Sequence, residues 1–223
     1  MYEKTALLYS RLWQYKNLVK KTSGFIKWAL QKVQTPYVAC SFGKDSAVML
    51  QLIIQQQPDI PVRFIRWKNE TEHIDNYDEV ISKWGNINLT QIEFSRDSLS
   101  DSRKDRYNTT DFDSYFIGLR QDESTVRRIT LKKNGMFYKT VAGIIRISPL
   151  SEWTDKDVAA YLFSNNLPVL NSYLADGITS RTASRIPRED YGIRLSFLSH
   201  LKHRDLNAYQ QLLKNFPEIK EYA

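Results

Sequence analysis

Short apolar runs alternate with amphipathic helical patterns between residues 36 and 94, and this alternation constrains the fold more than any other feature. Two segments, residues 45–57 and 74–84, carry apolar side chains at helical spacing. They separate three runs with the length and composition of buried strands: 37–41, 62–67 and 89–94. Strands separated by helices predict a parallel sheet that is covered by helices.

Two further strands are expected in the second half of the chain. Residues 115–119 and 144–147 repeat the apolar strand pattern, and the segment Lys-Asn-Gly-Met at 133–136 is interpreted as a hairpin turn between them. With the first three runs, these strands predict an α/β fold of Rossmann-like type with a five-stranded parallel sheet.

Helices are predicted at both ends of the chain. Residues 5–34 show helical spacing in two segments that break near Ser23 and Gly24, and residues 195–216 are again helical in pattern. The polar stretch 95–111 is expected to form a surface loop rather than core.

Composition excludes several classes of protein. The apolar runs in the 223 residues fall short of the roughly 20 residues that a membrane span needs, and the N-terminus lacks a signal-peptide pattern. We therefore expect a soluble, cytoplasmic protein with no membrane partner. The only cysteine, Cys40, excludes an internal disulfide and a cysteine-ligated cluster within one chain. The net charge of +7 favours polyanionic partners such as nucleotides or nucleic acid, and the alternative is a basic surface without a partner.

Six residues connect the first predicted strand to its helix: Ser41, Phe42, Gly43, Lys44, Asp45 and Ser46. Backbone NH groups converge on anions at a helix N-terminus, so this 41–46 loop is predicted to bind phosphate. Gly43 permits close approach of the backbone, Lys44 adds positive charge, and Ser41 and Ser46 offer hydroxyl donors. Asp45 is interpreted as a helix cap or an acceptor on the magnesium side. A simple helix cap without a ligand is the alternative.

The 41–46 loop resembles the PP-loop signature, Ser-x-Gly-x-Asp-Ser, of the adenine nucleotide α-hydrolase superfamily. Members bind ATP or an adenylyl compound, and many cleave the bond between the α and β phosphates. The resemblance therefore implies a Rossmann-like fold of the HUP type. It also implies ATP, or an adenylyl sulfate nucleotide, together with Mg²⁺.

Two further sequence blocks resemble particular families within this superfamily. Residues 118–124 (Gly-Leu-Arg-Gln-Asp-Glu-Ser), followed by Arg127, resemble the Gly-x-Arg-x-Asp-x-Ser-x-x-Arg block of phosphoadenosine phosphosulfate reductases and of the catalytic subunit of bacterial ATP sulfurylase. Residues 149–158 resemble their Pro-Leu-x-x-Trp-Thr-x-x-Asp-Val block, and residues 171–180 are more weakly similar to a stretch in the reductases and PP-loop FAD synthases. This order of motifs predicts one domain, with the following parts: 1–34, a helical preface; 35–165, a nucleotide-binding core; and 166–223, an irregular segment with a C-terminal helix.

Three basic residues form the predicted catalytic set: Lys44, Arg120 and Arg127. Arg120 follows a predicted strand, where its guanidinium can bind phosphate or sulfate through two parallel hydrogen bonds. Ordinary surface charge is the alternative for the arginines. Because nucleotides bind beyond the carboxyl ends of parallel strands, Gly118 and Trp67 are expected to contact the nucleotide as well. We predict no metal site made of protein ligands.

The sequence also departs from the reductases it resembles. Those enzymes attack the sulfonyl sulfur with a cysteine in a C-terminal Glu-Cys-Gly-x-His block, which this sequence lacks. Cys40 falls inside a predicted strand, where a cysteine usually serves as a small apolar side chain. Reduction by the familiar cysteine chemistry is therefore not expected.

The leading hypothesis is cleavage of ATP between its α and β phosphates, to adenylylate or activate an acceptor in sulfur transfer. The acceptor is sulfate or a nucleic acid, as in DNA phosphorothioation, where a cysteine desulfurase donates the sulfur. The alternatives are a regulatory module that binds an adenine nucleotide without turnover, and a phosphoadenosine phosphosulfate reductase that uses a partner's thiol.

Overall fold

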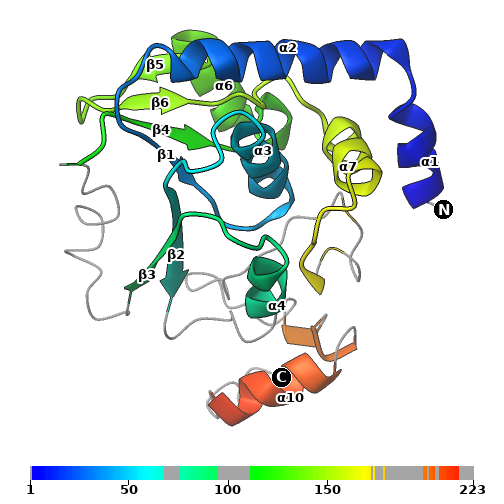
Figure 1. The fold of residues 1–223 in the computed structure, drawn as a ribbon. Coiled ribbons are helices and arrows are strands. Elements are labelled where there is room, and N and C mark those ends of the chain that lie inside the picture. The colour runs from blue at the N-terminus through cyan, green and yellow to red at the C-terminus, as the bar shows by residue number, and fades with distance from the viewer. Residues whose placement is uncertain are drawn as a thin grey trace.

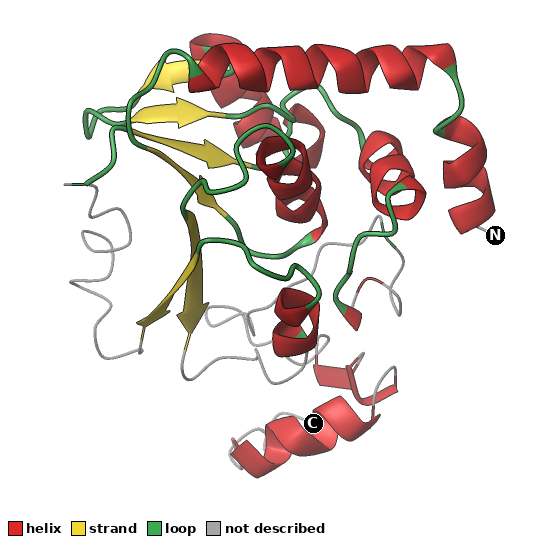
Figure 2. Cartoon of the chain, viewed as in Figure 1, coloured by secondary structure: helices red, strands yellow, loops and turns green. Residues whose placement is uncertain are grey.

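The computed structural model describes most of the chain, namely residues 2–67, 76–94, 111–171, 173, 178, 198–199, 201–203 and 206–215. One sheet with helices packed against it makes up its centre (Figures 1 and 2). The strands are β1 (Pro36–Ala39), β2 (Val62–Trp67), β3 (Leu89–Phe94), β4 (Ser114–Ile117), β5 (Phe137–Lys139) and β6 (Ile145–Ile147). The helices of eight or more residues are α1 (Tyr2–Tyr9), α2 (Trp13–Leu30), α3 (Lys44–Ile54), α6 (Thr125–Asn134), α7 (Asp155–Ser164) and α10 (Leu206–Asn215). Two shorter elements are α4 (Tyr77–Ser82) and the 3-10 turn η3 (Gln121–Glu123).

The strand order is β3-β2-β1-β4-β6-β5, and every neighbouring pair is parallel except β5 with β6. The Rossmann-like α/β prediction is confirmed. The chain runs from β1 outward through β2 to β3 and then crosses to β4 on the other side of β1. In sheets of this kind, the reversal point leaves a crevice at the carboxyl ends of the two central strands.

The predicted strand count was wrong, because the sheet has six strands and β5 was missed. The segment 133–136 is not a hairpin turn: it contains the end of α6, and Gly135, at φ 80°, donates its NH to the Leu131 carbonyl at 2.8 Å. A left-handed glycine after the last turn is a common helix ending. The hairpin lies one element later, where Thr140 N donates to the Ile144 carbonyl at 2.8 Å and joins β5 to β6.

The predicted break near Ser23 and Gly24 was also wrong, because α2 continues through both residues. The chain instead breaks after α1, where the Arg11 and Leu12 amides donate to carbonyls three residues earlier. Packing holds α2 together despite the glycine, since one face of the helix is buried against the core. The buried residues of this face are Tyr15, Thr22, Ile26 and Ala29.

Successive residues of the central strands point to opposite faces of the sheet. On β1 and β4, Val38 and Phe116 enter the main core with α2, α3 and α7, whereas Tyr37 and Tyr115 form a smaller cluster on the other face. Eight of the eleven residues of α3 are buried, so the helix that follows the 41–46 loop lies within the core. Among the described residues, no helix is long and apolar enough to cross a membrane.

Several predicted segments fall largely outside the described residues. The expected surface loop at 95–111 is described only at residue 111, and the irregular segment after residue 166 is described only in part. The helix expected at 74–84 is observed as Tyr77–Ser82, with residues 74 and 75 outside the described part.

Candidate functional site

The loops that leave β1 and β4 meet at the reversal point of the sheet. A Cβ atom on Gly118, just beyond β4, would lie 3.1 Å from both the Asp45 carbonyl carbon and the Ser46 nitrogen. Only glycine fits this approach without movement of the backbone. The structure thus brings the 41–46 loop and Gly118 together, as the two sequence blocks suggested.

Phe42 fixes the conformation of the 41–46 loop. Its φ angle is +53°, one of two positive values at non-glycine residues in the described chain, and its side chain is 1% exposed. The ring packs edge-on against Phe64 of β2 at 5.3 Å between centroids. A buried aromatic ring therefore holds the backbone in a left-handed turn, and Phe42 can offer only its main chain to a ligand.

The two serines of the loop bond to each other. Their hydroxyl oxygens are 3.1 Å apart, and the Ser46 hydroxyl lies 3.0 Å from the Gly43 carbonyl, to which it donates. Ser46 is buried, whereas Ser41 is exposed. Ser46 therefore closes the loop from inside, while Ser41 stays accessible to a ligand.

Gly43 precedes the first residue of α3 and caps the helix without a side chain. The first amides of any α-helix have no carbonyl partner within the helix, and they carry the positive end of its dipole. A Cβ at Gly43 would lie 3.0 Å from the Tyr173 hydroxyl and 3.4 Å from the Ser41 hydroxyl. Two hydroxyl groups thus face the backbone at the start of α3.

Arg120 is at the centre of a buried charge network. The side chain is 2% exposed, its Nε donates to Asp45 at 2.7 Å, and its Nη2 donates to Asp155 at 2.7 Å. Its Nη1 lies 3.3 Å from the Trp153 carbonyl. The guanidinium of the predicted phosphate-binding arginine is therefore paired with two carboxylates, and it links the 41–46 loop to the start of α7.

Lys44 joins the same network. Its Nζ lies 2.8 Å from Asp155 Oδ1, and the lysine side chain is 6% exposed. Burial alone would raise the pKa of Asp155, but the hydrogen bond from Lys44 and the charge of Arg120 outweigh burial, so the pKa lies below its usual value. Asp155 therefore stays ionised at neutral pH and holds both cations at the loop.

The pKa of Asp45 is shifted in the direction opposite to that of Asp155. Burial raises the pKa of Asp45 from 3.8 to about 6, although the charges of Arg120 and Lys44 act against this shift. The carboxylate of Asp45 binds Arg120, and that of Asp155 binds two cations. The interpretation of Asp45 as a helix cap was wrong, because Gly43 caps α3 without a side-chain hydrogen bond and Asp45 is the second residue of the helix. Its interpretation as an acceptor on the magnesium side stays a prediction.

Arg127 lies in the first turn of α6, at the edge of this network. It pairs with Glu123, whose other oxygen accepts the Arg120 amide at 2.9 Å. The Arg127 side chain is 41% exposed. Glu123 therefore links Arg127 to the backbone of Arg120, and within the described part of the chain the Arg127 guanidinium pairs with Glu123 rather than with the 41–46 loop.

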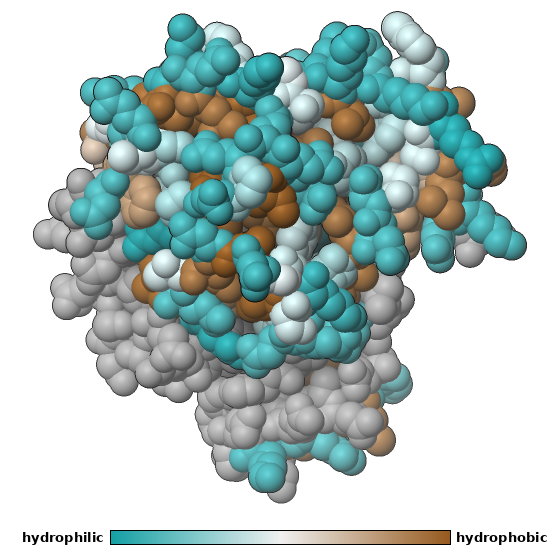
Figure 3. Space-filling model, viewed as in Figure 1, coloured by the Kyte–Doolittle hydropathy of each residue, from teal (hydrophilic) through white to brown (hydrophobic). Residues whose placement is uncertain are grey.

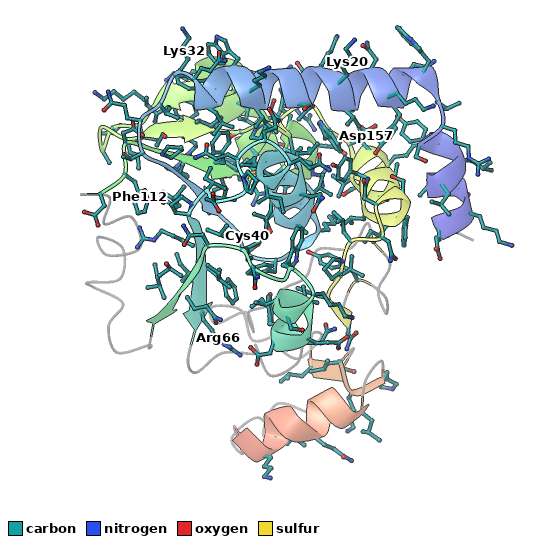
Figure 4. The ribbon with its side chains drawn as sticks, in the orientation of Figure 1. Lys20, Lys32, Cys40, Arg66, Phe112 and Asp157 are labelled. Atoms are coloured by element: carbon teal, nitrogen blue, oxygen red, sulfur yellow. The ribbon has the colours of Figure 1, made fainter. Side chains whose placement is uncertain are left out.

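Trp67 and Cys40 complete the residues singled out in the sequence. Trp67 is the last residue of β2, beside β1 as expected, but its side chain lies outside the described part of the chain. Cys40 lies in the interior (Figure 4), and burial raises the pKa of its thiol to about 11. The thiolate, which is the nucleophilic form, is therefore a small fraction at neutral pH.

Three residues of the site were not singled out by sequence reasoning: Glu123, Asp155 and Tyr173. Asp155 follows the helix cap Thr154, where an acidic residue is normal on electrostatic grounds alone. Glu123 and Tyr173 lie inside blocks quoted for the resemblance, at positions that the motif patterns leave open or assign only weakly. The contacts of Glu123 are local, with Arg120 and Arg127, whereas the roles of Asp155 and Tyr173 depend on contacts between distant segments, which spacing along the chain does not encode.

Comparison with known proteins gives a consistent family assignment. The model of the phosphoadenosine phosphosulfate reductase domain matches residues 35–109 and 99–180. The phosphoadenosine 5'-phosphosulfate reductase of Xanthomonas axonopodis pv. citri is 30% identical over 188 residues, covering 64% of this chain and 68% of the relative. The similar enzyme of Buchnera aphidicola is 27% identical, covering 73% of this chain and 77% of the relative.

Solved structures share the fold at lower identity. The phosphoadenylyl-sulfate reductase of Candida auris, in a phosphate complex, has a TM-score of 0.54 and 19% identity, covering 73% of this chain and 89% of that chain. The FMN adenylyltransferase of Candida glabrata, with FMN and an ATP analogue, has a TM-score of 0.57 and 16% identity, covering 78% and 68%. The family model spans well over half of the chain, including the 41–46 loop and the Arg120 block, so the chain belongs to the phosphoadenosine phosphosulfate reductase domain family.

Proposed function

We propose that this protein binds ATP at the 41–46 loop and cleaves it between the α and β phosphates to activate an acceptor for sulfur transfer. An acceptor oxygen attacks the α phosphorus, the bond from that phosphorus to the bridging oxygen breaks, and pyrophosphate leaves. The observation that carries the proposal is a rigid glycine-containing turn at the start of a buried helix, located at the reversal point of the sheet.

The 41–46 loop supplies groups suited to the pyrophosphate portion of the nucleotide. The backbone at Gly43 is unshielded by a side chain, and the hydroxyls of Ser41 and Tyr173 face it. Two proteins of this fold are known in complex with related ligands: the Candida auris reductase with phosphate, and the Candida glabrata adenylyltransferase with ATP. Binding of a phosphate group by backbone amides is common to such helix N-termini.

The basic residues divide into two roles in this proposal. Lys44 belongs to the loop itself, and its Nζ reaches phosphate by moving away from Asp155. Arg120 is a positioning residue, because its guanidinium holds Asp45 and Asp155 in place. Arg127 supports the Arg120 backbone through Glu123. Trp67 and Gly118 are proposed to line the adenine side, beyond the carboxyl ends of β2 and β4.

The cysteine content favours activation over reduction. The sequence contains one cysteine, and burial of Cys40 keeps its thiol protonated at neutral pH. Transfer of sulfur to an activated acceptor would use a sulfur donor from a partner, for which a cysteine desulfurase is the proposed class. The three parts of the domain, 1–34, 35–165 and 166–223, are proposed to act as one unit around this site.

Product analysis tests the proposal. Incubation of the purified chain with ATP and Mg²⁺ should yield AMP and pyrophosphate, separated by ion-exchange chromatography. A Gly43→Ala variant should bind ATP less tightly, since its methyl group would meet the Tyr173 hydroxyl at 3.0 Å. Release of ADP and orthophosphate would contradict the assignment. ATP binding without any product would indicate a regulatory nucleotide-binding module instead.

Reduction of a phosphosulfate nucleotide is the second candidate, and the names of the relatives favour it. In that reaction a thiol attacks the sulfonyl sulfur, the sulfur–oxygen bond to the nucleotide breaks, and a second thiol releases sulfite. Both thiols would come from a partner, since Cys40 is buried. Sulfite formed from phosphoadenosine phosphosulfate with reduced thioredoxin, and retained in Cys40→Ala, would support this alternative.

A further inference from the structure

The segment from residue 11 to residue 34, which contains α2, concentrates positive charge. It includes one arginine, five lysines and no acidic residue, whereas the whole chain has a net charge of +7. The six cations are Arg11, Lys16, Lys20, Lys21, Lys27 and Lys32. The charge of this one short segment, +6, is therefore almost as large as the net charge of the whole chain.

These cations lie on the outer side of the molecule. All six are exposed, and within the described part of the chain none of them forms an ion pair with a carboxylate. At 100° per residue, Lys16, Lys20 and Lys27 fall within a 40° sector of α2. Figure 4 labels Lys20 on the side of α2 that faces away from the sheet and Lys32 just beyond the end of the helix, and Figure 3 shows many hydrophilic side chains along this edge.

Exposed tryptophans accompany the lysines. Trp13 is 75% exposed and Trp28 is 43% exposed, near opposite ends of α2. The Trp28 ring is held in place, because it stacks on Phe25 at 5.7 Å and meets Phe137 edge-on at 5.1 Å. An aromatic ring that is both fixed and accessible is suited to stacking on a planar ligand.

We propose that the outer face of α2, defined by Trp13, Lys16, Lys20, Lys27 and Trp28, binds single-stranded nucleic acid. The lysines contact successive phosphates, and the tryptophans stack on bases. A helix of this length spans about 27 Å, enough for several nucleotides. Stacking needs unpaired bases, so the tryptophans favour a single strand over a duplex.

An anionic membrane is the competing polyanion, and the packing of α2 disfavours it. A helix that lies in a membrane surface inserts a continuous apolar face between the lipids. The apolar face of α2 is already buried in the protein: Ile26 and Ala29 are 0% exposed. At 100° per residue, Trp13 falls within 60° of the three lysines. Trp28 lies further round the helix, where its ring packs against Phe137 of β5, so the two tryptophans do not form a continuous apolar face for lipid.

The buried face of the same helix is in contact with the site described above. Trp153 Nε1 donates to Thr22 Oγ1 of α2 at 2.8 Å, and the Trp153 carbonyl lies 3.3 Å from Arg120 Nη1. The inference rests on the proposed function in one respect, which is the role of the bound strand. That strand would be the acceptor in sulfur transfer, or would carry the acceptor group. Binding itself requires no nucleotide.

The test measures binding of a fluorescein-labelled 20-nucleotide single strand, without ATP, at several salt concentrations. The triple variant Lys16→Gln, Lys20→Gln, Lys27→Gln should lower the affinity roughly tenfold or more, and should reduce the slope of log K against log salt by about 2, or about 0.7 for each lost phosphate contact. Trp13→Ala should weaken binding severalfold and reduce the quenching of tryptophan fluorescence by the strand.

A matched control removes the same charge elsewhere. Arg128, Lys132 and Lys133 are exposed on α6, and their triple glutamine variant should keep the affinity within about twofold. An equal loss of affinity in both triple variants would show that binding depends only on the net charge of the protein, and would overturn the proposal. Binding to phosphatidylserine vesicles but not to the oligonucleotide would also overturn it. A chain that forms AMP but fails to bind the strand would contradict this inference and leave the proposed function standing.

Discussion

Gly118 lies directly against the backbone of Asp45, with no room for a side chain between the loops that follow β4 and β1. The contact is made at the reversal point of the sheet, where ligands bind in folds of this kind. Two segments 73 residues apart in the sequence therefore determine one surface. This relationship leads to the first prediction.

The Gly118→Ala variant should distort the 41–46 loop. Its methyl group would lie 3.1 Å from main-chain atoms of Asp45 and Ser46, which are not free to rotate away. We expect the free energy of unfolding to fall by about 1–3 kcal/mol, and ATP affinity by isothermal calorimetry to fall with it. Gly24→Ala is the control: its Cβ meets nothing within 4 Å inside α2, and the change should stabilise the protein by about 0.5–1 kcal/mol. Unchanged ATP affinity in Gly118→Ala would contradict the proposed position of the site.

The Arg120→Lys variant should destabilise the protein although it keeps the positive charge. A lysine cannot reproduce the planar fork that binds Asp45 and Asp155 together. Arg120 is 1% exposed and Asp45 is 16% exposed on its side chain, so the lost contact leaves a poorly solvated carboxylate, whereas Asp155 keeps Lys44 as a partner. We expect a loss of about 2–3 kcal/mol in urea denaturation. Arg128→Lys, at an exposed position of α6, should change stability by less than about 0.5 kcal/mol. Equal effects of the two substitutions would argue against the network.

The Asp45→Asn variant should flatten the dependence of stability on pH between about 4 and 6. Burial raises the pKa of Asp45 to about 6, so in this range the folded protein holds a proton that the unfolded chain has released. The resulting stability is present below pH 4 and is lost as the pH rises through 6. A pKa shift of about two units changes the free energy of unfolding by about 3 kcal/mol at most. Urea denaturation of both proteins at pH 4, 5, 6 and 7 measures the difference.

Asp155→Asn provides the control of opposite sign for that experiment. The pKa of Asp155 lies below its usual value, so its contribution to stability is present above about pH 4 and is lost as the pH falls. The variant should therefore be less stable than the wild type at pH 7 and should approach it in acid. Parallel pH curves for the two variants would show that the pKa shifts do not have opposite signs.

The Cys40→Ala variant should retain turnover. Cys40 is 3% exposed just beyond β1, and burial raises the pKa of its thiol to about 11. We expect the rate of AMP formation to stay within about threefold of the wild type, with a modest loss of stability from the small cavity. Iodoacetamide at pH 8 should label the folded protein slowly and the unfolded protein fast. Complete loss of activity in a folded Cys40→Ala protein would reinstate the thiol as a reactant.

Local patterns were sufficient to predict the central part of the fold. β1, β2, β3, β4 and β6 were each found from apolar runs, because parallel strands buried on both faces are continuously apolar. β5 was missed because it is a three-residue edge strand of mixed polarity, Phe-Tyr-Lys, whose existence depends on pairing with β6. The glycine in α2 was wrongly interpreted as a break, since burial of Ile26 and Ala29 outweighs its low helix propensity.

The candidate site was also predictable only in part, because some of its contacts depend on pairing between distant segments. The 41–46 loop and Gly118 were selected as candidates because glycine and a strand-to-helix junction leave a signal in the sequence, and the structure brings them together. Nucleotide binding by them stays a prediction. The partners of Arg120 and Lys44 were not, because Asp155 lies 111 residues beyond Lys44 and resembles an ordinary helix-capping acid. Ion pairing between remote segments is determined by the folded chain rather than by spacing.

The burial of α3 bears on how a ligand would be recognised. With eight of its eleven residues enclosed, the helix cannot shift without disrupting the interior, and the turn that precedes it is held equally firmly by the Phe42 ring. The conformational entropy of that turn is lost when the polypeptide folds rather than when a ligand arrives. Association should therefore be fast and require little rearrangement of the main chain, and discrimination between ligands would depend on fit to a preformed shape.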